Sequence, residues 1–106
     1  MSAWTYLILA GILEIGFASM IKQTENFTRL YPTIIFVVFA VASFYSLTKA
    51  VETIPIGTAY AVWTGIGAFG TILIGIFLYN EPAGMLRLFF LFTLVASIIG
   101  LKLVSH

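Results

Sequence analysis

The sequence predicts an all-α integral membrane protein with four transmembrane helices in a single domain, residues 1–106. Hydrophobic residues make up 61% of the chain and charged residues 8%, and the mean hydropathy is +1.12. A soluble domain is about 25% charged, so the composition excludes that class, and disordered chains are also rich in charge. One helical span needs about 20 residues, so four spans with short connections fit this length.

Each span is bounded by polar residues or prolines. We expect the spans at residues 4–21, 32–50, 57–79 and 85–104. The first stops at the polar segment 22–26, and the third stops before 80–82. The apolar residues within 34–41 are continuous rather than alternating, which favours helices over the strands of a membrane barrel.

The three prolines agree with these boundaries. Pro32, Pro55 and Pro82 each fall at or just before a predicted helix start. Proline lacks a backbone N–H, and the first turn of a helix is where that donor has no partner. No proline therefore interrupts a predicted span.

The basic residues are almost evenly divided between the two sides of the membrane. Lys49 and Lys102 belong to one side, whereas Lys22, Arg29 and Arg87 belong to the other. Orientation follows an excess of Lys and Arg on the cytoplasmic side, so this bias is weak. Either partners and helix hydrophobicity set the topology, or the chain inserts both ways and pairs with an inverted copy of itself.

Several classes of site are excluded. The chain has no cysteine, which rules out disulfides and thiolate metal sites. The net charge is +1 and there is no basic tract, so no nucleic-acid partner is expected. We expect no catalytic residues, no metal site and no cofactor, and therefore not an enzyme.

Glu14 is the most informative residue, because it lies well inside the first span. Acidic residues within a membrane are costly and usually face a cavity and serve a function. The structural alternative is an ion pair, but Lys22 lies about 12 Å along the same helix, too far for direct pairing. An ion pair with another helix stays open.

The neighbours of Glu14 on its helix face are Ala10, Gly11, Phe17 and Ala18. Three of them are small, and small residues either let helices approach closely or leave room for a ligand. Burial disfavours the charged form of a carboxylate, so Glu14 can carry a proton. A cation that competes for the same carboxylate would then move against the proton, with the proton gradient as the energy source.

The third span carries a stripe of residues suited to a pocket, which includes Tyr60, Trp63 and Gly67. Aromatic rings attract cations and donate hydrogen bonds. Tyr60 fits either a pocket or an interfacial aromatic belt, and Trp63, which lies deeper, favours a pocket. Gly65 and Gly67 provide either a helix bend or a close helix contact.

Other polar or small residues inside the spans have two interpretations each. Ser43 bonds either to its own helix or to Glu14 or a ligand. Ala96 and Gly100 form a small-xxx-small pair in the fourth span, which predicts packing in a dimer.

Together these motifs resemble the small multidrug resistance (SMR) transporters over essentially the whole chain. The resemblance rests on Glu14 with Lys22 eight residues later, on 27–30 followed by Pro32, and on the signature at 55–67. It implies an antiparallel, dual-topology homodimer in the bacterial inner (plasma) membrane that exchanges protons for small organic cations.

The resemblance also implies roles for individual residues. Glu14 would bind proton and substrate in turn, Tyr60 and Trp63 would line the substrate pocket, and Ser43 would belong to the hydrogen-bond network around the carboxylate. Phe17 would form part of the pocket wall.

The subtype implied is the guanidinium-exporter branch. Thr58, Thr64 and the segment 99–102 are similar to that branch, but Phe17 stands where it usually carries tryptophan. The alternatives are a broader exporter of quaternary ammonium or hydrophobic aromatic cations (multidrug efflux), or one half of a heteromeric pair. From other classes, a non-transporting membrane subunit and a pore also stay open.

Overall fold

The computed structural model describes residues 2–104, which form four long helices and one short one. The elements are α1 (Ala3–Met20), the 3₁₀ helix η1 (Lys22–Thr24), α2 (Leu30–Ala50), α3 (Ile56–Leu78) and α4 (Met85–Val104). All four α-helices are long and apolar enough to cross a membrane. The predicted all-α class with four membrane helices is confirmed. The ends of each expected span lie within two residues of the ends of the corresponding helix.

Local sequence explains where the helices begin. The Ser2 hydroxyl caps α1 by accepting a hydrogen bond from the backbone N–H of Thr5, at 3.2 Å. Pro55 immediately precedes α3, and Pro82 lies three residues before α4. Pro32 differs slightly from the prediction, because α2 starts two residues earlier and places this proline inside its first turn. That position also tolerates a missing N–H.

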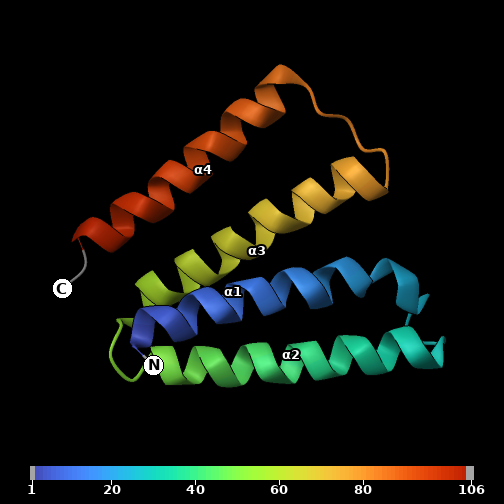
Figure 1. Cartoon of the computed structure of the whole chain (residues 1–106), viewed down its shortest axis with the longest axis horizontal. Helices are drawn as coiled ribbons and strands as arrows, with labels where there is room; N and C mark the ends of the chain where they lie inside the picture. The colour runs from blue at the N-terminus through green and yellow to red at the C-terminus, as the bar shows by residue number, and fades with distance from the viewer. Residues whose placement is uncertain (1, 105–106) are drawn as a thin grey trace.

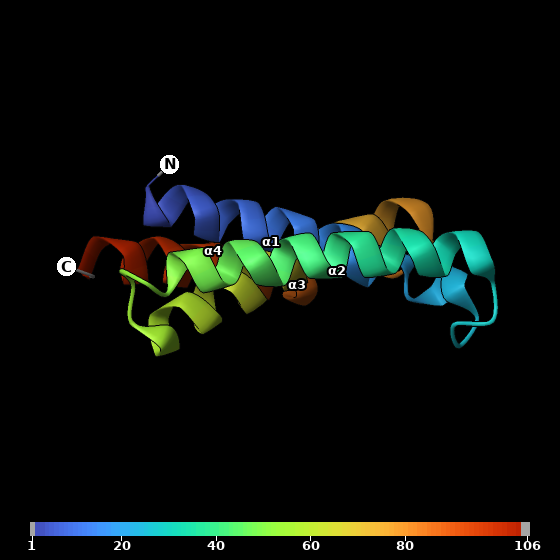
Figure 2. The same cartoon turned by 90° about the horizontal axis from the view of Figure 1, so that it is seen from below.

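The helices form a flat assembly in which α1 lies between α2 and α3, and α4 packs on α3 (Figure 1). The molecule measures 42 × 35 × 19 Å, and its thinness is seen in the edge-on view (Figure 2). Both ends of the described chain and the α2–α3 connection lie at one end, here called the terminal end. The α1–α2 and α3–α4 connections lie at the opposite end, called the loop end.

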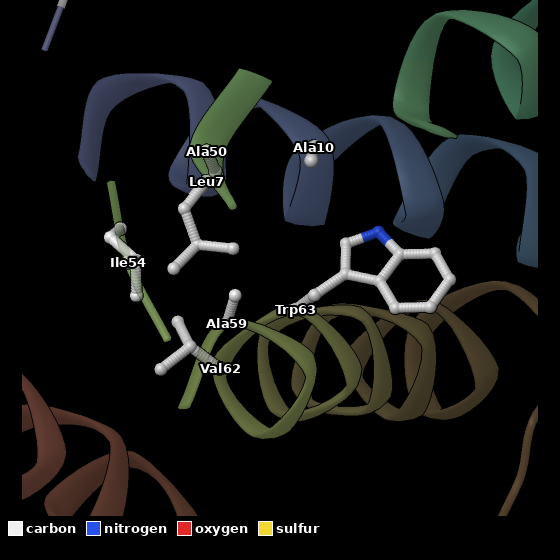
Figure 3. Close-up of a cluster of buried hydrophobic side chains, with 7 residues drawn as sticks. All are labelled: Leu7, Ala10, Ala50, Ile54, Ala59, Val62 and Trp63. Carbon is white, nitrogen blue, oxygen red and sulfur yellow. The ribbon is translucent and has the colours of Figure 1, made fainter. Parts of the chain in front are cut away.

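The buried core sits towards the terminal end, where α1 and α3 meet the last turn of α2 (Figure 3). Its members are Leu7, Ala10, Ala50, Ile54, Ala59, Val62 and Trp63. α4 supplies none of these seven residues, although Ile98 and Leu101 of α4 pack against them, and Leu91 is the one residue of α4 that is buried. Much of the remaining apolar surface of α4 is exposed in the single chain.

Glycines bring α1 and α3 close together. A Cβ atom on Gly11 would lie 2.7 Å from the Cβ of Ile66, and one on Gly70 would overlap the side chain of Ile15. Membrane helices gain most of their association energy from such close van der Waals packing. The tight α1–α3 interface is what brings the first and third spans into one site.

Candidate functional site

The Glu14 carboxyl group projects from α1 onto the backbone of Gly67 on α3. A Cβ atom on Gly67 would overlap this carboxyl group, so only glycine leaves the space that the carboxyl group fills. The Oε1 atom of Glu14 is buried, and no described residue offers it a hydrogen bond. An unpaired buried acceptor is unusual and costly, and it marks a place where a proton or an N–H donor can bind.

A second cluster of polar groups surrounds Ser43 of α2, which contacts α1 at Ala10, one helical turn before Glu14. The Ser43 hydroxyl donates to the backbone carbonyl of Ala10 at 2.6 Å and accepts from the indole N–H of Trp63 at 3.0 Å. Ser43 is fully buried and Trp63 is 8% exposed. These bonds join α1, α2 and α3, and they satisfy the indole donor as expected for a buried tryptophan.

Ser43 forms no hydrogen bond with Glu14 among residues 2–104. Its proton goes to Ala10, four residues before Glu14, and this carbonyl is the one that helix geometry pairs with the Glu14 backbone N–H. Ser43 thus supports the helix turn that carries the carboxylate. Its predicted membership of a network around the carboxylate stays a prediction.

Aromatic rings form a row across the three packed helices. The ring centroids of Tyr60 and Trp63 are 5.8 Å apart, and those of Trp63 and Phe44 are 5.3 Å apart. The ring of Phe44 is in turn stacked with that of Phe17, at a centroid distance of 6.1 Å. Phe17 also meets Phe36 edge-on at 5.5 Å. Tyr60 is 59% exposed, which suits either a wall open to a partner or an interfacial belt.

The small residues near Glu14 have different surroundings. Ala10 and Gly11 are buried in helix contacts, whereas Ala18 lines a cavity at the loop end. On α3, a Cβ atom on Gly65 would lie 2.7 Å from Ile98 Cδ1 of α4. Gly65 and Gly67 therefore both stand at close contacts, and a bend at these glycines stays a prediction, since α3 is one continuous helix.

The predicted dimer-packing residues, Ala96 and Gly100, lie on a surface of α4 that is not packed against another described helix. Ala96 is exposed, and nothing lies within 4 Å of a Cβ atom placed on Gly100. This surface is free for another helix, and its use in a dimer stays a prediction.

The structure adds residues that sequence reasoning missed. Thr71 lies one turn beyond Gly67 on α3, and its buried hydroxyl finds no partner among residues 2–104. Thr71 follows Gly67 by four residues, and this spacing could have placed the two residues on the same face of the third span. Phe36 and Phe44 were missed because α2 is apolar on every side, so no pattern marked the face that meets α1.

Comparison with known proteins shows the family of the chain. The family model described as Small Multidrug Resistance protein matches residues 2–94. A protein of Citrobacter freundii named "Guanidinium exporter" is 49% identical over 104 residues, 98% of this chain and 99% of its own length. One of Yersinia pseudotuberculosis with the same name is 48% identical over 103 residues, 97% and 99% of the two lengths. The chain therefore belongs to the Small Multidrug Resistance protein family.

Proposed function

We propose that this protein is a proton-coupled antiporter that exports guanidinium-type small cations by alternating access. The observation that carries the proposal is the Glu14 carboxyl group, which lies against Gly67 in the middle of two membrane helices and has one buried oxygen with no partner among the described residues. A proton and a cation compete for this carboxylate, so only one is carried at a time. The proton gradient supplies the energy, and no cofactor or enzymatic step is needed.

Guanidinium fits this site chemically. Its planar N–H donors match a carboxylate, as in arginine–carboxylate pairs. Relatives that cover nearly the whole chain bear the name "Guanidinium exporter". The rings of Trp63 and Tyr60 provide faces that attract a cation next to the carboxylate turn.

The working unit in this proposal is an antiparallel, dual-topology homodimer in the bacterial inner membrane. The balanced distribution of basic residues supports insertion in both orientations. The uncovered surface of α4 supports association with a second copy. Pairing with a homologue instead would make this chain one half of a heteromeric transporter.

A second candidate function, broader export of quaternary ammonium or hydrophobic aromatic cations, is favoured by Phe17. This ring is stacked with Phe44 and edge-on to Phe36 and offers no N–H donor to Glu14. An apolar aromatic wall accepts bulky cations that a hydrogen-bonding wall rejects.

The test is cation-evoked current from purified protein on a solid-supported membrane. We expect current with guanidinium and with phenylguanidinium, and a much smaller one with tetraethylammonium. Comparable tetraethylammonium currents would favour the broader exporter. Binding of guanidinium should weaken as the pH falls, because protons then occupy Glu14.

Two variants sharpen this test. Glu14→Gln should abolish the current and the pH dependence of binding, whereas Glu52→Gln, which removes an exposed loop carboxylate paired with Lys49, should keep both. Retained transport in Glu14→Gln would show that the carboxylate is not the coupling site. Conductance without proton coupling would indicate a pore, and silence from a stable homodimer would indicate a non-transporting subunit.

A further inference from the structure

A cavity of about 470 Å³ lies between α1 and α3 at the loop end. Its walls include Ala18, Ser19, Lys22, Thr71, Tyr79 and Glu81. Ala18 follows Glu14 by one turn of α1, and Thr71 follows Gly67 by one turn of α3. Because α1 and α3 run in the same direction (Figure 1), Ala18 and Thr71 both lie about 6 Å further along their helices towards the loop end than Glu14 and Gly67.

The backbone places a carboxylate at this cavity. Asn80 has a φ of 56°, which folds the chain back over the end of α3, and the backbone N–H of Glu81 bonds to the carbonyl of Gly75 at 3.1 Å. A Cβ atom on Gly75 would overlap the Glu81 carboxyl group. The left-handed turn and the missing side chain together hold Glu81 against α3.

Both cation-binding groups of the cavity already hold cations of the chain itself. The Glu81 carboxylate accepts a hydrogen bond from the Arg87 guanidinium at 3.1 Å. The ring of Tyr79 lies under the ammonium group of Lys22, 5.1 Å from the ring centroid. A carboxylate and an aromatic face are the groups that recognise guanidinium ions.

The Tyr79 ring is held in place, and one polar group is free. The Tyr79 hydroxyl donates to the carbonyl of Ser19 at 3.2 Å and accepts from the side chain of Gln23 at 2.7 Å. The buried Thr71 hydroxyl has no partner among the described residues. Thr71 lines this cavity one turn beyond Gly67, and the Glu14 carboxyl group, whose Oε1 also lacks a partner among the described residues, lies against Gly67. A donor-rich cation passing along α1 and α3 therefore meets acceptors in series.

We propose that this cavity is a second, transient site for guanidinium-type cations, in which the cation replaces the Arg87 guanidinium on Glu81 and the Lys22 ammonium group over the Tyr79 ring. The inference rests on the proposed function, since it gives the Glu14 site an exit or loading stage. Displacement is feasible because partly exposed ion pairs such as Arg87–Glu81 are weak, and Arg87 can turn into water.

Two glycine amides allow each site to be observed separately. Gly67 lies against Glu14 and Gly75 lies against Glu81, so protein labelled with ¹⁵N-glycine reports both carboxylates in one spectrum. We would titrate detergent-solubilised full-length protein with guanidinium chloride, and with sodium chloride at equal ionic strength. Guanidinium should shift both amides, whereas sodium should shift neither.

Variants separate the second site from the first. In Glu14→Gln the Gly67 response should disappear and the Gly75 response should remain, and in Glu81→Gln the reverse should hold. Arg87→Gln should lower the guanidinium midpoint at Gly75 by about two- to fivefold, the range expected when a partly exposed ion pair no longer competes. Glu52→Gln, another loop carboxylate with a basic partner, should leave both responses unchanged.

Defined results would overturn the inference. A Gly75 shift that vanishes in Glu14→Gln would show that the shift reports a conformational change caused by binding at Glu14, and not binding at Glu81. A shift that persists in Glu81→Gln, or an unchanged midpoint in Arg87→Gln, would exclude exchange on the carboxylate. A Gly67 response with a silent Gly75 overturns only the second site, whereas a silent Gly67 with no guanidinium current overturns the proposed function itself.

Discussion

At the scale of single residues, the site depends on a carboxyl group that occupies the space left by a glycine. Glu14 and Gly67 come from different helices, and the contact places a buried acceptor where no described residue satisfies it. The cost of such an unpaired group is removed when a proton or a cation binds. The absence of a side chain at Gly67 is therefore as important to the proposed chemistry as the carboxylate.

Gly67→Ala should reduce guanidinium binding and current by about tenfold or more, because forcing a methyl group into a packed contact costs about 1–3 kcal/mol. The new methyl would push the Glu14 carboxyl group from its place. Gly57→Ala is the matched control, since nothing lies within 4 Å of its added methyl. Isothermal titration with guanidinium compares the two variants, and equal affinities would contradict the assigned contact.

Ser43→Ala should lower the free energy of unfolding by about 1–3 kcal/mol, because the buried Trp63 N–H loses its acceptor. Ser46→Ala is the control, one turn away on the same helix. Its hydroxyl donates to Ala42 within its own helix at 2.9 Å, so its loss should have little effect. Denaturant titration in detergent measures both, and equal destabilisation would mean that the interhelical bond contributes nothing.

At the scale of elements, α1, α2 and α3 share a row of aromatic rings. Phe17 of α1 contacts Phe36 and Phe44 of α2, and Phe44 leads to Trp63 of α3. Each ring pair adds about 0.5–1.5 kcal/mol beyond the area it buries, so the row also holds the helices together. It lines the side of the bundle where a bulky apolar cation would be accommodated.

Phe17→Leu should decrease transport of phenylguanidinium and of bulky ammonium ions more than transport of guanidinium, because it removes the aromatic surface and keeps an apolar side chain. Phe92→Leu is the control, since Phe92 is 72% exposed and belongs to α4, which packs on α3 and not on α1 or α2. Currents on a solid-supported membrane give the selectivity ratio. An unchanged ratio in Phe17→Leu would remove this ring from substrate selection.

At the scale of the whole molecule, the single chain leaves much apolar surface uncovered. α4 packs on α3, and Leu91 is the one residue of α4 that is buried. Among residues 2–104, nothing lies within 4 Å of a Cβ atom placed on Gly100, and Ala96 is exposed. Lipid covers such a surface without cost, but small residues in this spacing let another helix approach closely.

Gly100→Ile should reduce the dimer fraction in detergent several-fold, because the larger side chain prevents close helix approach while fitting the single chain. Gly57→Ile is the control, as its position is equally open but lies at the start of α3. Light scattering coupled to size exclusion gives the fraction. An undisturbed dimer in Gly100→Ile would place the interface elsewhere.

The order of the residues alone predicts the four helices and identifies Glu14 as a candidate functional residue. Span length, hydropathy and the prolines at helix starts act locally, and a carboxylate deep in an apolar run is visible without tertiary structure. The packing of the helices was needed to show that Glu14 meets Gly67, that Ser43 joins Ala10 to Trp63, and that the buried Thr71 hydroxyl has no partner among residues 2–104. The physical reason is that membrane helices are apolar on all sides, so no periodic pattern shows which face packs against a neighbour.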